Sequence, residues 1–236
     1  MNRVVTSLIL ACCVSQMASA AHYLRDDERE RAEWKVIRTV TGDLNSDGTP
    51  DTVSVGEEVN RKNFKKNDGY GEKVLNVNPR DLVIMFRTRS GGRGKTFEIN
   101  QFLPSEHSVE EPCLSDPLEG GEGVQIVKGI LEISLQYWYS CGSWGVSATS
   151  FKFRYEQGRF RLIGLEESSH MRNSGDATAS STNFLTGKKK IITENVFDPS
   201  VPQKVSWKKL AGNRFYYLDE MTPECVVSKK GQDWCK

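Results

Sequence analysis

Alternating hydrophobic and polar positions in the middle of the chain predict antiparallel β-strands. Residues 124–127 and 130–135 are apolar-rich runs on either side of Lys128-Gly129, a dipeptide typical of a tight hairpin turn. Residues 151–163 repeat this pattern over a similar length and predict a second hairpin. The two hairpins together predict a four-stranded antiparallel meander.

Strands are also predicted over most of the remaining chain. The candidates are 34–40, 52–55, 82–86 and 96–102, followed by hairpins at 183–196, turning at Gly187-Lys188, and 205–218, turning at 211–213. Two segments predict loops: 56–80, rich in Asn, Lys and Gly, and 104–123, with three prolines and a Gly-Gly. The pattern therefore predicts a mainly β fold, an antiparallel meander or sandwich with a short N-terminal helical arm. The charged residues 21–33 form that arm, and 34–236 form one β-rich domain.

Strand parity separates a core face from a polar face between residues 131 and 139. The predicted core side carries Leu131, Ile133, Leu135, Tyr137 and Tyr139. Trp138 therefore lies among polar side chains on the opposite side, and Trp144 follows in a glycine-rich turn. Exposed tryptophans beside polar groups bind protein partners or stack on sugar rings, so both are candidate partner-binding residues. The alternative is that a loop or a second sheet covers both rings.

Composition narrows the class of protein. The 236 residues carry 32 Lys and Arg against 31 Asp and Glu, a balance that argues against nucleic-acid binding. Residues 1–20 have the features of a signal peptide, with Arg3, an apolar run over 4–14 and Ala18-Ser19-Ala20 as the cleavage site. The alternatives are a buried N-terminal helix or lipoprotein processing at Cys12. After signal removal no membrane span is predicted, and the expected location is periplasmic or secreted.

Four cysteines remain after removal of the signal peptide. They are Cys113, Cys141, Cys225 and Cys235. An even number in an oxidising compartment predicts two disulfides, for which three pairings are possible. We expect Cys113–Cys141 and Cys225–Cys235, because the second pair closes a short loop and fixes the C-terminus. Metal binding is not expected of these residues, since no pair has Cys-x-x-Cys spacing.

The sharpest motif is the segment Asp43-Leu-Asn45-Ser-Asp47-Gly48-Thr49-Pro-Asp51. Side-chain oxygens fall at its positions 1, 3, 5 and 9, the glycine at position 6 permits a sharp turn, and the Thr49 carbonyl adds an oxygen. Oxygen donors without His or Cys select Ca²⁺ over transition metals. The segment is not an EF-hand, because position 12 is Ser54 and a strand follows. A polar turn without metal is the alternative, since Asn, Asp and Gly favour turns.

The residues Gly42-Asp43-Leu44-Asn45-Ser46-Asp47-Gly48 and Asp51 resemble the calcium loops of FG-GAP (integrin-type) and VCBS-type repeats. This resemblance implies a structural Ca²⁺ held by Asp43, Asn45, Asp47, Asp51 and the Thr49 carbonyl. The loop occurs once, so the chain cannot form a propeller by itself. The chain also resembles small exported bacterial proteins of unknown function. These pair one such loop with a meander ending in Phe-Arg-Tyr-x-x-Gly-Arg-Phe-x-Leu-Ile-Gly, here residues 153–164. That resemblance implies a bacterial envelope setting and no particular activity.

No catalytic residue is assigned from the sequence. Cys141-Gly142-Ser143-Trp144 resembles part of the nucleophile segment of papain-like proteases, but the second cysteine is missing and His170 follows too closely. Metalloprotease, nucleophile-elbow and phosphate-loop motifs are absent. The sequence therefore predicts an exported, calcium-stabilised binding or structural module of the bacterial cell envelope, whose partner is another envelope protein or a glycan. The alternative is a cell-wall or glycan hydrolase, whose carboxylates no motif would locate.

Overall fold

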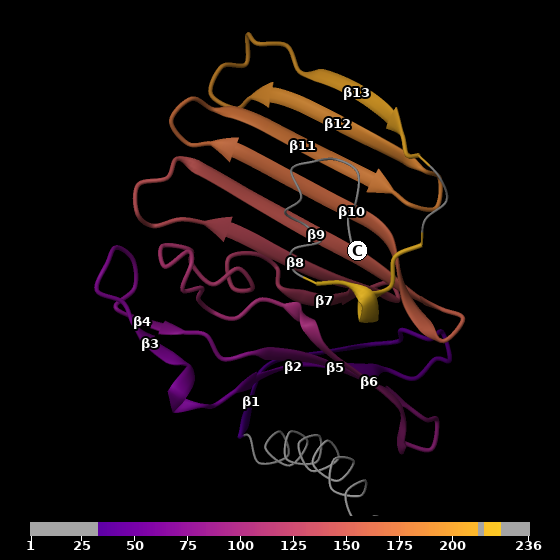
Figure 1. The fold of residues 1–236 in the computed structure, drawn as a ribbon. Helices are drawn as coiled ribbons and strands as arrows, with labels where there is room; N and C mark the ends of the chain where they lie inside the picture. The colour runs from indigo at the N-terminus through magenta and orange to yellow at the C-terminus, as the bar shows by residue number, and fades with distance from the viewer. Residues whose placement is uncertain (1–32, 212–214, 223–236) are drawn as a thin grey trace, which may run out of the picture.

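The computed structural model describes residues 33–211 and 215–222 and arranges them as antiparallel sheets (Figure 1). The elements are β1 (Trp34–Gly42), β2 (Asp51–Glu58), η1 (Arg61–Asn63), β3 (Phe64–Lys66), β4 (Val74–Asn76), β5 (Arg80–Arg87), β6 (Arg93–Leu103), β7 (Val124–Val127), β8 (Ile130–Trp138), β9 (Gly145–Glu156), β10 (Arg159–Met171), β11 (Asp176–Asn183), β12 (Lys188–Asn195), β13 (Lys204–Lys209) and η2 (Leu218–Glu220). One sheet has the order β1-β2-β5-β6, a larger one β13-β12-β11-β10-β9-β8-β7, and β3 pairs with β4. The predicted mainly β, antiparallel fold is confirmed. The predicted arm lies outside the described residues apart from Glu33.

The predicted four-stranded meander is confirmed as β7 to β10. Its first turn has φ values of +51° at Lys128 and +77° at Gly129, and its last has +49° at Gln157 and +86° at Gly158. Two consecutive positive φ values define the hairpin turn whose twist matches that of the flanking strands. Glycine follows in each case because it adopts this backbone without a steric penalty.

The core lies between the four-stranded sheet and the β7–β10 half of the seven-stranded sheet, which face each other (Figure 1). Alternate residues of both sheets fill it, as the strand pleat requires. Phe102 of β6 packs edge-on against Phe151 and Phe153 of β9, with ring centroids 5.0 and 5.7 Å apart. Leu131, Ile133 and Leu135 are buried there, as the strand parity predicts.

Strands β11 to β13 extend the larger sheet beyond the four-stranded sheet, on the far side of β10 (Figure 1). Most of their side chains are exposed or half-buried, and all six residues of β13 are exposed. Residues 176–183 carry no strand signal in the sequence because no second sheet covers them and hydrophobic alternation is not required. No helix in the described ranges is long and apolar enough to cross a membrane.

Three sequence expectations are wrong in detail. The hairpin predicted over 183–196 is instead formed by β11 and β12, so its first strand ends at Asn183, where the prediction began it. The predicted loop 56–80 contains the end of β2, the turn η1 and the β3–β4 ribbon. The predicted hairpin over 205–218 does not form, because β13 pairs with β12 whereas Tyr217 bridges to Arg161 of β10. Leu218 is fully buried, so the apolar end of this segment packs in the core and cannot follow the exposed β13.

Candidate functional site

The segment 43–51 joins β1 to β2 and curls around its own polar side chains. The carboxylate of Asp43 accepts hydrogen bonds from the backbone N–H groups of Asp47 (3.2 Å) and Gly48 (2.9 Å). The Asn45 side-chain oxygen also accepts from the Asp47 N–H at 3.0 Å, and Asp47 accepts from the Thr49 N–H at 2.7 Å. Positive φ values at Ser46 (+62°) and Gly48 (+84°) make these contacts possible. The side chains of Asp43, Asn45 and Asp47 therefore share hydrogen bonds within one tight loop.

Asp51 fixes this loop to the sheet. Its side chain is fully buried, and its two carboxylate oxygens accept from the backbone N–H groups of Leu44 (2.9 Å) and of Arg87 on β5 (3.0 Å). Burying a carboxylate is unfavourable unless hydrogen bonds satisfy it, and these two bonds do so. Asp51 thus has a structural role at the base of the loop, independent of any ion.

The chemistry of the donor set fits a hard cation. It comprises three carboxylates, one amide oxygen and one carbonyl, with no nitrogen or sulfur donor. The Asn45 amide donates to Asp47 Oδ2 at 3.0 Å, so part of the Asp47 carboxylate is taken up within the loop. In the described ranges no three His, Cys, Asp or Glu side chains form a group that could hold a metal ion.

Hydrogen bonding keeps Asp47 ionised. The Thr49 N–H and the Asn45 amide lower the pKa of its carboxyl below the usual value, with a smaller contribution from the positive charge of Arg89. The Arg89 guanidinium also donates to the Asp47 carbonyl at 3.1 Å. A negative charge at Asp47 is therefore maintained below neutral pH, as a cation site requires.

The two predicted partner-binding tryptophans are exposed at one end of β8 and in the following turn. Trp138 is 42% exposed and Trp144 is 56% exposed, so neither a loop nor a sheet covers them. The Arg172 guanidinium lies 5.5 Å from the centre of the Trp138 ring. The backbone N–H of Arg172 donates to the Trp144 carbonyl at 2.8 Å. The alternative of a covering loop or sheet is therefore wrong, and the Arg172 cation lies against one of the two exposed rings.

The predicted Cys113–Cys141 disulfide is present beside this surface. It joins the 104–123 loop to the residues that follow β8, with a Cα–Cα distance of 5.5 Å. The Ser140 N–H reinforces the junction by donating to the Cys113 carbonyl at 2.8 Å. Cys225 and Cys235 lie outside the described residues.

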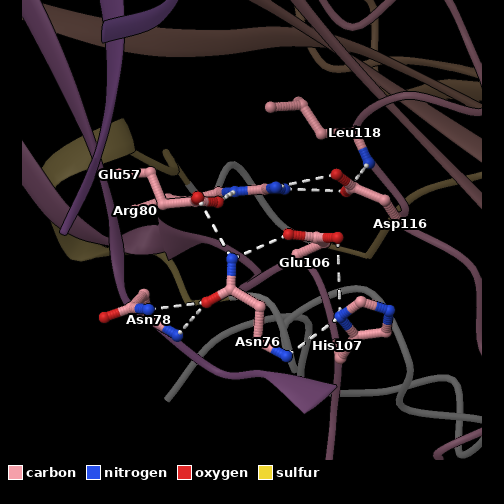
Figure 2. Close-up of polar contacts among 8 residues, drawn as sticks. All are labelled: Glu57, Asn76, Asn78, Arg80, Glu106, His107, Asp116 and Leu118. Atoms are coloured by element: carbon pink, nitrogen blue, oxygen red, sulfur yellow. Dashed lines mark hydrogen bonds and ion pairs between the residues drawn. The ribbon is translucent and has the colours of Figure 1, made fainter. Parts of the chain in front are cut away.

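A buried polar cluster that sequence reasoning missed connects the four-stranded sheet to the 104–123 loop (Figure 2). The Arg80 side chain, 3% exposed, donates twice to Asp116 at 2.7 Å and once to Glu57 at 2.9 Å. Burial lowers the pKa of this guanidinium, but the hydrogen bonds and charges of Asp116 and Glu57 outweigh it and raise the pKa. The sequence signal is parity: Arg80 occupies the same side of β5 as Leu82 and Ile84.

Asn76 extends the cluster towards the surface (Figure 2). Its amide nitrogen donates to Glu57 at 3.1 Å and to Glu106 at 2.7 Å, and its side-chain oxygen accepts from the Asn78 amide at 2.6 Å. Its backbone N–H donates to His107 Nδ1 at 3.1 Å. Asn76 therefore brings two carboxylates together, as a hydrolase would need, but existing partners occupy both.

Two hollows open on the larger sheet, and neither includes this cluster. The first, of about 620 Å³, lies across β8 to β12. Its lining alternates with the core residues of these strands, so it lies on the face turned away from the core. Small side chains dominate this lining, including Ser134, Ala148, Ser150, Ser168, Ala179 and Ser181. The second, of about 520 Å³, includes Tyr137, Tyr139 and Met171.

Comparisons with protein-family models, with curated proteins and with solved structures found no match to this chain.

Proposed function

We propose that this protein is an exported, calcium-stabilised β domain that acts as a binding or structural module of the bacterial cell envelope. The observation that carries the proposal is the 43–51 loop, whose oxygen donors lie on one tight turn anchored to β5 through Asp51. Its partner, another envelope protein or a glycan, binds at Trp138 and Trp144. These rings are exposed beside a disulfide-braced loop, where an aromatic surface is held rigid.

The ion has a folding role in this proposal. Its ligands in this proposal are Asp43, Asn45, Asp47, Asp51 and the Thr49 carbonyl, and Asp51 also holds the base of the loop. When bound, Ca²⁺ neutralises the charges of carboxylates that otherwise repel one another within nine residues. The connection between β1 and β2 is then fixed, and with it the edge of the four-stranded sheet.

Thermal unfolding of the full chain with Ca²⁺ and with a chelator tests the ion. At a Ca²⁺ concentration 100-fold above the dissociation constant, linkage predicts about 2.7 kcal/mol of stabilisation. For a domain of this size that amounts to an increase of roughly 5–11 °C in the unfolding midpoint. The informative variant is Asp43→Asn/Asp47→Asn, because asparagine removes both charges while its side-chain oxygen can still accept one backbone hydrogen bond at each position.

The matched control is Asp198→Asn. Asp198 accepts a turn hydrogen bond from the Ser200 N–H at 2.9 Å, outside the predicted calcium loop. We expect the calcium-dependent increase in the wild type and in Asp198→Asn, and its loss in the double variant. An increase that persists in the double variant, or none in the wild type, contradicts a calcium site in this loop.

Co-purification from the cell envelope tests the tryptophan surface. Trp138→Ala/Trp144→Ala should lose a bound partner and keep its unfolding midpoint, since both rings are exposed. Phe215→Ala is the control, because Phe215 is 52% exposed and stacks on Arg161, at the opposite end of β10 from the residues that pair beside Trp138. Equal partner recovery with both variants contradicts this surface. Activity on peptidoglycan that disappears on replacement of one Asp or Glu would instead establish a hydrolase.

A further inference from the structure

Lysines are concentrated at one edge of the seven-stranded sheet. Strand β12 contributes Lys188, Lys189 and Lys190, and β13 contributes Lys204, Lys208 and Lys209. The register places Lys188 directly opposite Lys209, and Lys189 directly opposite Lys208. Like charges in directly opposed positions destabilise a sheet. This arrangement is local, because the whole chain has a net charge of +1.

The two opposed pairs differ in their surroundings. Lys189 lies on the side of the sheet that continues from the core, where its ammonium pairs with Glu167 at 2.7 Å. Lys188 and Lys209 lie on the other side, where neither makes an ion pair with another described residue. Their mutual repulsion is therefore left uncompensated within the described part of the chain.

An exposed aromatic ring completes this surface. Trp207 is 65% exposed and lies opposite Lys190, so Lys188, Lys190, Lys209 and Trp207 share one side of the sheet, here called the lysine face. Carboxylates also lie on this side of the sheet. Glu166, in the row of Lys190, pairs with Lys152 at 2.7 Å, and Glu132, in the row of Lys188, lies four strands away next to the same Lys152. Glu194, further along β12, accepts a hydrogen bond from the Gln203 amide at 2.8 Å. The lysine face therefore has spare positive charge around a free aromatic ring.

The lysine face continues into the larger hollow. Lys190 and Ile192 line its β12 side. Across β8 to β11 its lining combines serine and alanine side chains with Lys152 and with the carboxylates of Glu132, Glu166 and Glu167, and Glu122 lies at its margin. The anionic groups of a ligand would therefore lie over the lysine face, and its neutral hydroxyl groups over the hollow, where serines and carboxylates can bond to them. The volume of the hollow, about 620 Å³, is in the range of ligand sites. Ser134 and Ser150 hydroxyls lie 2.8 Å apart in that lining, where they can also bond to an outside group.

We propose that the lysine face and the adjoining hollow bind an anionic glycan, a chain of sugar rings bearing carboxylate, phosphate or sulfate groups. The ammonium groups of Lys188, Lys190 and Lys209 pair with the anionic substituents. The Trp207 ring stacks on a sugar face, and the serine hydroxyls bond to sugar hydroxyls. The proposal uses neither the calcium loop nor Trp138 and Trp144, so it stands or falls separately from the proposed function.

A simpler role for these lysines is protection of an edge strand against pairing with other chains. That role needs charge alone, and it requires neither an exposed tryptophan among the lysines nor a hollow beside them. The two explanations differ in their expected ligands. If the lysines only protect the edge, binding of a charged polymer should not depend on the Trp207 ring. A glycan site should instead bind a charged sugar polymer more tightly than a charged peptide.

Binding of the purified full chain to defined polymers tests the proposal. The probes are dextran sulfate, uncharged dextran of the same length, polyglutamate, single-stranded DNA and anionic lipid vesicles, each titrated at low and physiological salt. The variants are Lys188→Gln/Lys190→Gln/Lys209→Gln and, separately, Trp207→Ala. The matched control removes three lysines from the η1–β3 region, as Lys62→Gln/Lys65→Gln/Lys66→Gln.

We expect dextran sulfate to bind most tightly, with an affinity that falls as salt rises. The Lys188/Lys190/Lys209 variant should bind it at least about tenfold more weakly, and the control triple variant should match the wild type within about twofold. Trp207→Ala should weaken the binding of dextran sulfate about fivefold and leave the binding of polyglutamate unchanged. The unfolding midpoint of the lysine variant should not fall, since the substitutions remove a repulsion.

Three results would overturn the proposal. One is equal binding of dextran sulfate and polyglutamate without an effect of Trp207→Ala, which reduces the surface to nonspecific charge. The second is tighter binding of DNA or vesicles than of dextran sulfate, which assigns it to a nucleic acid or a membrane. The third is no binding of dextran sulfate at low salt, which leaves edge protection as the role of the lysines.

Discussion

Replacing Arg80 with methionine removes the cation that joins two buried carboxylates. The Arg80 side chain is 3% exposed, and its partners Glu57 and Asp116 are 12% and 11% exposed. Methionine fills much of the same volume, so the variant keeps the packing and loses the three hydrogen bonds. Both carboxylates then remain shielded from water without a positive charge beside them.

The expected loss follows from that geometry. Removing one partner of a buried ion pair costs about 3–5 kcal/mol. Arg80 compensates two carboxylates and binds one of them through two hydrogen bonds, so we expect the upper part of that range, about 4–5 kcal/mol. For a domain of this size the unfolding midpoint should fall by roughly 8–20 °C.

Thermal unfolding followed by circular dichroism at neutral pH measures this loss. Lys66→Met is the control, because Lys66 and its partner Asp68 are 80% and 81% exposed, and the change should stay within about 0.5 kcal/mol. Arg80→Met/Glu57→Gln/Asp116→Asn should recover stability relative to Arg80→Met, because neutral amides replace the unpaired charges. A loss below about 1 kcal/mol in Arg80→Met, or no recovery in the triple variant, would refute the reasoning.

The remaining predictions concern the disulfide, one turn and acid stability. Replacing Cys113 and Cys141 with serine removes the disulfide between residues 28 positions apart and should lower the free energy of unfolding by about 3–4 kcal/mol. An unchanged midpoint of urea unfolding would contradict this. Gly129 has a φ of +77°, so Gly129→Ala should lower the free energy of unfolding by about 1 kcal/mol in the same assay. An unchanged stability would show that this turn does not require glycine. Burial raises the pKa of the Glu156 carboxyl, but Arg154 and Arg161 outweigh it and hold the pKa below 4.5. A carboxyl whose pKa is lower in the folded state than in the unfolded state stabilises the fold at pH values above its unfolded pKa. The loss in free energy of unfolding caused by Glu156→Gln should therefore be full at neutral pH and shrink below about pH 4. An equal loss at both pH values would contradict that assignment.

Local pattern predicted the site residues unevenly. The 43–51 loop, the exposed tryptophans and the Cys113–Cys141 pair were predictable, because turn chemistry, strand parity and cysteine pairing each leave a signature in short segments. The Arg80 cluster was not, because Glu57, Arg80 and Asp116 come from three separate segments. An arginine at a core position of β5 is a sign that a buried partner exists, but the sequence does not identify that partner.

The sequence by itself determined the meander, its two glycine turns and the mainly β class. These follow from contacts between neighbouring strands, where hydrophobic alternation fixes the buried face. Tertiary structure alone decided three features: β11 to β13 extend past the second sheet, Leu218 packs in the core after Tyr217 bridges to Arg161, and Lys188 faces Lys209. Each of these outcomes depends on which apolar surface is already covered when the chain folds back. That is a property of the packed sheets as a whole and of no single segment.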